Sequence, residues 1–179
     1  MNFKDEESRE LFFRYAIPCS ETLAERGVIS KKYQKMLMKN LSLNKKIPKN
    51  SENIFKVASS MCEKTTKRLG KKTVDKEVIR KYFLFGHDKV VDKRFKLFKD
   101  FDPMQCRLYS GKVVSLRNKA TVQIVIGKRK YKTDFTRSLK VGDYVVVHRN
   151  FVVEKINEDL AKKLWKLKER YLISKKIKI

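Results

Sequence analysis

The chain has 179 residues, 41% of them hydrophobic, which is enough for one medium domain or two small ones with packed cores. Lys and Arg number 45 against 20 Asp and Glu, and the resulting net charge of +25 favours a polyanionic partner. The three cysteines form no Cys-x-x-Cys motif, which argues against a zinc knuckle. No apolar run is long enough to cross a membrane, and the odd cysteine count fits a reducing compartment, so we expect a cytoplasmic protein.

Residues 1–102 have the apolar spacing and the end signals of helices, which predicts an all-helical domain. Several of the expected helices start at a residue that can cap them, and they carry apolar residues on one face. The expected caps are Ser20, Ser30, Ser51 and Thr73, and the expected stops are Pro18, Gly27, Gly70 and Gly86. A last helix is expected over residues 89–98, and residues 99–104, with Pro103, mark the domain boundary.

From Cys106 the apolar period changes to two, which predicts strands. We expect five short strands, over residues 107–116, 120–127, 128–135, 144–148 and 151–156. Their short connections favour a closed, OB-like barrel, and Asn157 can cap a C-terminal helix with an apolar stripe of Leu160, Leu164, Leu167 and Tyr171. The predicted fold is therefore α+β, with a helical domain at 1–102 and a five-stranded OB-like β-barrel with a C-terminal helix at 103–179.

The predicted barrel half is the more basic, with 20 Lys or Arg and 6 Asp or Glu in residues 104–179. This concentration predicts a nucleic-acid surface in which basic residues contact phosphates and aromatic residues stack on bases. RNA is preferred to DNA, because no motif that reads a duplex is present. Tyr131 alternates with charged residues, which also permits a core position. The candidate contacts are Arg107, Tyr109, Lys128, Arg129, Lys130, Tyr131, Lys132, Arg149, Lys162 and Lys166.

His148 closes the predicted strand over residues 144–148. Side chains alternate along a strand, so Tyr144, Val146 and His148 share one face and His148 lies at the rim of the barrel. Two interpretations remain open: His148 only ends the strand, or it works chemically because Cys106 faces it.

The segments MQCRLYSGKVVSL (104–116) and SLKVGDYVVVHRNFVVEKINEDLAKKL (138–164) resemble the HypC/HupF family of hydrogenase-maturation chaperones. The shared features are a Cys five residues before Gly-Lys-Val, a Gly-Asp-Tyr-Val turn and strand, a His, and an acidic-started helix. The resemblance implies an OB-like barrel, and implies that Cys106 and His148 handle the iron centre delivered to a nickel-iron hydrogenase. This sequence departs from the pattern at Ser110, where the family has Pro, and in placing the Cys after a helical domain. The helical half resembles only uncharacterised archaeal proteins, which implies no activity.

The sequence offers few parts for catalysis. It contains no Gly-rich phosphate loop, nucleophile motif or metal-ligand spacing, and the adjacent His87 and Asp88 fit a helix junction better than a catalytic pair. We therefore expect a protein that is not an enzyme and has no cofactor. The favoured function is RNA binding without catalysis, and the alternative is a HypC-like metallocentre or hydrogenase-maturation chaperone using Cys106 and His148. A protein partner stays open in either case.

Overall fold

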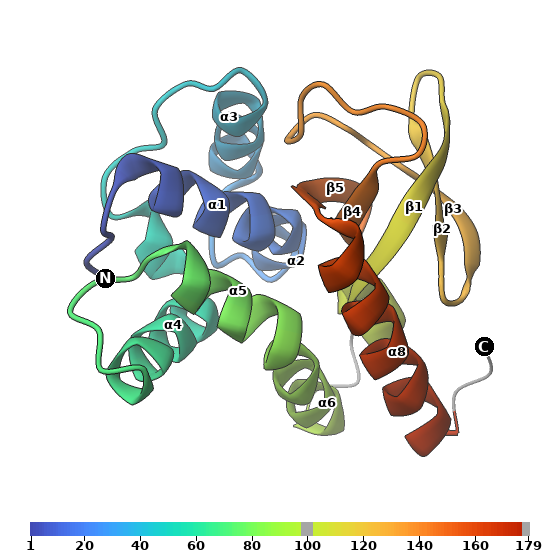
Figure 1. The fold of residues 1–179 in the computed structure, drawn as a ribbon. Coiled ribbons are helices and arrows are strands. Elements are labelled where there is room, and N and C mark those ends of the chain that lie inside the picture. Colours follow the sequence, from blue (N-terminus) through green and yellow to red (C-terminus); the bar gives the residue numbers. More distant parts are fainter. Residues whose placement is uncertain (98–101, 177–179) are drawn as a thin grey trace. The chain divides into compact units, whose positions relative to one another are not determined.

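A computed structural model describes residues 1–97 and 102–176 and divides the chain into two compact units, Met1–Phe98 and Lys99–Ile179 (Figure 1). The boundary expected at residues 99–104 lies partly outside the described residues. The architecture is α+β, with helices followed by an antiparallel sheet and a C-terminal helix. No helix within the described ranges has both the length and the apolar composition needed to span a membrane.

The N-terminal unit is built from short helices, as predicted. They are α1 (Glu6–Ala16), α2 (Ser20–Glu25), α3 (Lys31–Ser42), α4 (Lys56–Arg68), α5 (Lys76–Phe85) and α6 (His87–Leu97), with 3₁₀ helices η1 (Ile17–Cys19) and η2 (Ser51–Ile54). Ser30 caps α3 as expected, since its side chain accepts a hydrogen bond from the amide of Tyr33. The cap expected at Ser51 is wrong: its hydroxyl donates to the Pro48 carbonyl, and α4 begins only at Lys56.

The cap expected at Thr73 is also misplaced by two residues. Asp75 caps α5 instead, and its carboxylate accepts from the amide of Val78 at 2.9 Å. Gly86 ends α5 as predicted. The core of this unit is aromatic, with Tyr15 stacked on Phe83 at a centroid distance of 4.9 Å.

The C-terminal unit contains one five-stranded antiparallel sheet with the strand order β3-β2-β1-β4-β5. The strands are β1 (Leu108–Leu116), β2 (Ala120–Ile124), β3 (Gly127–Tyr131), β4 (Tyr144–His148) and β5 (Phe151–Ile156). The prediction of a closed barrel is wrong, because the edge strands β3 and β5 do not form a ladder with each other.

One isolated parallel bridge joins the two edges, between Lys132 and Phe151. The Lys132 amide donates to the Asn150 carbonyl at 2.7 Å, and the Val152 amide donates to the Lys132 carbonyl at 2.9 Å. After Lys132 the chain turns away into the loop that carries Phe135, whose ring stacks on Phe151. The two edges of the sheet therefore meet at this single bridge, and the sheet does not close into a barrel.

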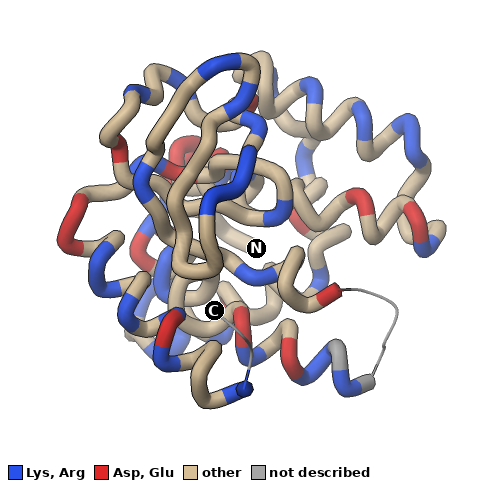
Figure 2. The backbone as a smooth tube through the Cα atoms, turned by 90° about the vertical axis from the view of Figure 1, so that its right-hand side faces the viewer, with Lys and Arg blue, Asp and Glu red and all other residues tan. Residues whose placement is uncertain are grey.

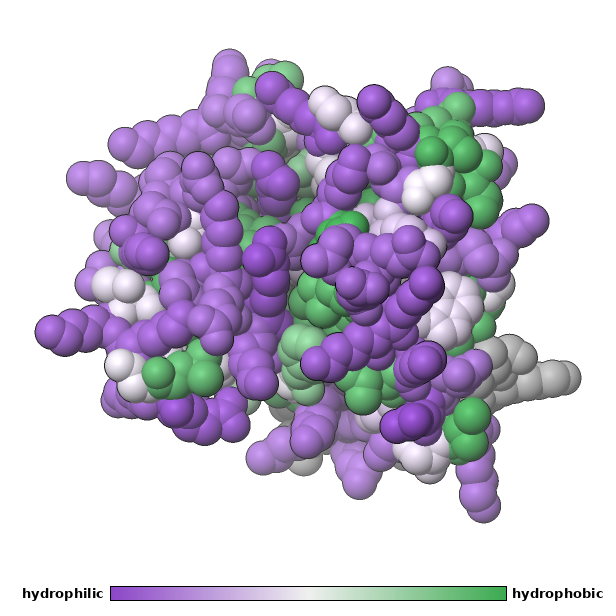
Figure 3. All heavy atoms as spheres, viewed as in Figure 1, coloured by the Kyte–Doolittle hydropathy of each residue, from purple (hydrophilic) through white to green (hydrophobic). Residues whose placement is uncertain are grey.

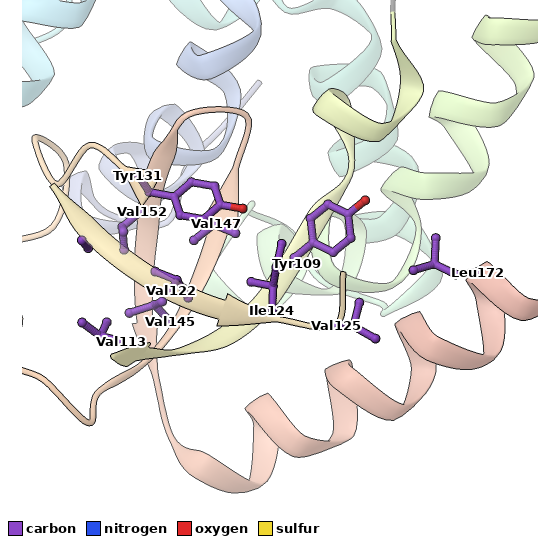
Figure 4. Close-up of a cluster of buried hydrophobic side chains, with 11 residues drawn as sticks. Tyr109, Val113, Val122, Ile124, Val125, Tyr131, Val145, Val147, Val152 and Leu172 are labelled. Carbon is purple, nitrogen blue, oxygen red and sulfur yellow. The ribbon is translucent and has the colours of Figure 1, made fainter. Parts of the chain in front are cut away.

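The concave side of this sheet holds an apolar core (Figure 4). Its members include Tyr109 and Tyr131, whose rings lie among the valines of β2, β4 and β5. Gly111 brings β1 close to β2: a Cβ at this position would lie 2.2 Å from the carbonyl oxygen of Gln123. Only glycine permits this approach.

Helix α8 (Glu158–Ser174) packs against β1 and β4. Asn157 caps it as predicted, accepting from the Leu160 amide at 2.9 Å. The expected apolar stripe is partly wrong, because Leu167 is 43% exposed. The residues of α8 that are buried are Ala161, Leu164 and Leu172, so the buried face is rotated from the expected one.

Candidate functional site

Cys106 lies where the short helix α7 (Pro103–Cys106) leads into β1. Asp102 caps this helix by accepting from the Met104 amide at 2.8 Å. The Cys106 side chain is half-buried and forms no disulfide. The thiol therefore lies at a structured junction and remains partly accessible.

His148 ends β4 and is 1% exposed. Its register partner on β1 is Leu108, which brings the ring beside the end of α7. The Nε2 atom lies 3.1 Å from the carbonyl oxygen of Cys106. A carbonyl can only accept a hydrogen bond, so Nε2 carries the hydrogen and donates it. His148 and Cys106 thus meet through the backbone of Cys106.

Arg149 approaches the sulfur itself, with its Nη1 3.7 Å from Cys106 Sγ. Arg149 and Asn150 form the two-residue turn between β4 and β5, and Arg149 has a positive φ of 51°. The bridge to Lys132 holds this turn on the opposite side. A guanidinium in this place is a favourable neighbour for a thiolate.

The residues around Cys106 do not make a complete metal site. Within residues 1–97 and 102–176, no group of three or more His, Cys, Asp or Glu side chains is arranged to hold an ion. A resident zinc or iron site needs about four ligands. Any metal held at Cys106 would therefore bring its other ligands with it or receive them from a partner.

Three of the predicted nucleic-acid contacts are buried, which corrects their expected role. Tyr109 is 5% exposed and Tyr131 is 4% exposed, and both belong to the core of the sheet (Figure 4). Burial also raises the pKa of Tyr131 to about 12. Arg107 is buried as well, with its guanidinium over the Tyr171 ring. These side chains are not available to contact bases or phosphates.

The other predicted basic contacts lie at the surface. Arg149 is half-buried, and the exposed ones are Lys128, Arg129, Lys130, Lys132, Lys162 and Lys166. They do not all lie on the same face of the sheet, because neighbouring residues of a strand point to opposite faces. Arg129 pairs with the core residue Val122, whereas Lys128 pairs with Gln123 on the other face. Lys132 lies over the Phe151 ring.

A groove between α8 and the sheet was not predicted from the sequence. It has a volume of about 280 Å³ and is lined by Gly111, Lys112, Gln123, Tyr144, Ala161, Lys162, Trp165 and Lys166. The Tyr144 hydroxyl donates to Glu158 at 2.8 Å, which raises the pKa of Tyr144. Lys162 pairs with the same carboxylate and holds its pKa below the usual value. The alternation of β1 predicts that Lys112 points away from the core of the sheet. No signal in the sequence predicts where α8 lies on the sheet, so the groove could not be found.

Two comparisons with known proteins bear on this unit. The HupF/HypC family model matches residues 106–167, from Cys106 to the exposed Leu167 of α8. The C-terminal unit therefore resembles this family of chaperones, as the sequence motifs predicted. No curated protein matches the chain. The resemblance suggested for the helical half has no support, and RNA binding stays a prediction.

Proposed function

We propose that the C-terminal unit is a HypC-type maturation chaperone in which the Cys106 thiolate holds an iron-containing fragment on its way to a hydrogenase. The observation that carries this proposal is the fixed, half-buried Cys106 thiol at the start of the matched segment. His148, at the end of β4, contacts the backbone carbonyl of Cys106, and Arg149, in the turn that follows, contacts its sulfur.

The chemistry follows from these two contacts. A thiolate is a soft ligand suited to iron, and the Arg149 guanidinium offsets its negative charge. One protein ligand holds a metal only weakly, which suits a carrier that must release its cargo. His148 acts here as a positioning residue, because its Nε2 fixes the Cys106 carbonyl and so the direction of the side chain.

The chain departs from the family in what precedes the cysteine. In the family the Cys lies almost at the start of the mature protein, whereas here residues 1–105 come before it. The amide of Cys106 is therefore not a free amine and cannot serve as a ligand in that form. In the proposed carrier, the sulfur is therefore the atom of Cys106 that binds the iron.

The test uses the full chain, isolated without oxygen from cells that mature a nickel-iron hydrogenase. Native mass spectrometry measures the bound iron, and Cys19→Ser serves as the matched control because Cys19 is also a half-buried cysteine outside any disulfide. We expect Cys106→Ser to lose the iron and Cys19→Ser to keep it. Equal iron content in the two variants would contradict the proposal.

A second pair of variants separates positioning from ligation. His148→Gln keeps an N–H that can reach the Cys106 carbonyl, whereas His148→Ala removes it. We expect the Gln variant to retain most of the bound iron and the Ala variant to lose about 10–100-fold in affinity, as for other second-layer partners of metal ligands. Loss of iron in both variants would make His148 a ligand instead.

A further inference from the structure

A stretch of the C-terminal unit carries only positive charge. Between Asp102 and Asp134 the sequence has no Asp or Glu, and it has eight Lys or Arg. Figure 2 shows the result on the β2–β3 hairpin, where blue segments occur without red ones. A solvated surface normally mixes both signs, so this stretch needs a physical reason.

The strand register collects part of this charge on one face of the sheet. Lys128 on β3 pairs with Gln123 on β2, Gln123 pairs with Lys112 on β1, and Lys112 pairs with Tyr144 on β4. Paired residues of neighbouring strands point to the same side. The four side chains therefore form a row across four strands, about 14 Å long at the usual strand spacing. Lys130, opposite Thr121, lies on the same face.

The row leads into the groove beside α8. Three of its members, Lys112, Gln123 and Tyr144, line the groove, and Trp165 and Lys166 of α8 line it from the other side. The Trp165 ring is partly buried against the sheet core and partly exposed. Over α8, Figure 3 shows mostly hydrophilic side chains with hydrophobic ones between them. The groove thus has an aromatic wall and cationic edges.

Few carboxylates compete for these cations. Glu158 pairs with Lys162 at 2.8 Å at the end of the groove. In the described part of the chain, no acidic side chain forms an ion pair with Lys128, Lys130 or Lys166. We call Lys112, Lys128, Lys130, Lys162 and Lys166, together with the groove, the lysine face.

We propose that the lysine face binds single-stranded nucleic acid, with the phosphates contacting the lysines of this face and a base against Trp165 in the groove. Single-strand binders combine a cationic path for the backbone with aromatic rings on which bases stack. An acidic peptide would use the lysines but has no need of the aromatic wall. Cys106 lies outside this face, so the proposal does not depend on the chaperone function.

The test measures binding of the full chain to fluorescein-labelled 12-nucleotide RNA and DNA single strands by anisotropy, between 50 and 200 mM salt. The main variant is Lys128→Gln/Lys130→Gln. The control, Lys31→Gln/Lys35→Gln on α3, removes the same charge from exposed positions of the other unit. Arg129→Gln is a further control, since Arg129 points away from the lysine face.

Each phosphate contact contributes about 0.7 to the slope of log affinity against log salt. The main variant should therefore lower the slope by about 1.4 and weaken binding roughly 10–30-fold at 100 mM salt. The controls should change affinity less than about threefold. No binding at 50 mM salt, or equal losses in main and control variants, would overturn the proposal.

Trp165 gives an independent readout, because it is the chain's one tryptophan. Stacking of a base should quench its fluorescence at the concentrations that change the anisotropy, and Trp165→Phe should still bind because an aromatic ring remains. Binding without any change of this fluorescence would show that no base stacks on Trp165 and that the groove is not part of the binding site. Equal competition by a poly-glutamate peptide of the same charge would assign the face to acidic proteins instead.

Discussion

Replacing Leu172 tests whether α8 is held by the core of the sheet. Leu172 is 0% exposed and belongs to the apolar core of the sheet, where Figure 4 shows it at the edge formed by α8. Truncating a buried Leu to Ala typically costs about 2–5 kcal/mol, from the lost apolar contact and the cavity that remains. Small domains have about 5–15 kcal/mol of stability in total, so Leu172→Ala should remove a large share of it.

Leu167→Ala is the matched control for this variant. Leu167 lies on the same helix but is 43% exposed, and the change in helix propensity is the same at both positions. We expect Leu167→Ala to alter the free energy of unfolding by less than about 1 kcal/mol. The comparison therefore isolates burial from helix propensity.

The assay is urea unfolding followed by the fluorescence of Trp165, which reports on α8 alone because the chain has one tryptophan. With a slope of about 1–2 kcal/mol per molar urea, Leu172→Ala should lower the midpoint by about 1 M or more. The midpoint of Leu167→Ala should stay near that of the unmodified chain. Equal midpoints for the two variants would show that α8 is not docked on the sheet core.

Three other outcomes are expected. Gly111→Ala should destabilise the unit by about 1–3 kcal/mol in the same assay, because its Cβ would overlap the Gln123 carbonyl; an unchanged midpoint would contradict the strand spacing. The hydrogen bond from Lys155 holds the pKa of Asp143 below 3.8, so Asp143 should stabilise the fold above that pH and lose this effect as the pH falls through its lowered pKa. The urea midpoints of Asp143→Asn and the unmodified chain should thus differ at pH 6, and the difference should shrink as the pH falls below 3.8. Burial raises the pKa of Cys62 to about 12, so iodoacetamide at pH 8 should alkylate the other two cysteines and leave Cys62 unlabelled in peptide mass spectra.

The sequence by itself determined the kinds of elements in this protein. The change of apolar period near Cys106 predicted helices before it and strands after it, and the caps at Ser30 and Asn157 are where they were expected. These signals are local, because a cap or a period depends only on residues a few positions apart. Where two capping residues lay close together, as at Thr73 and Asp75, local rules did not choose between them.

Tertiary structure decided which faces are used. Alternation showed that Tyr131 and Lys130 point to opposite sides of β3, but only the packing of the sheet placed Tyr131 in the core. The contact of His148 with Cys106 spans 42 positions and follows from the pairing of β1 with β4. The groove beside Trp165 likewise requires α8 to lie against β1. Such contacts join residues that are distant in the sequence, so the site exists only because the strands pair in this register and the helix docks on them.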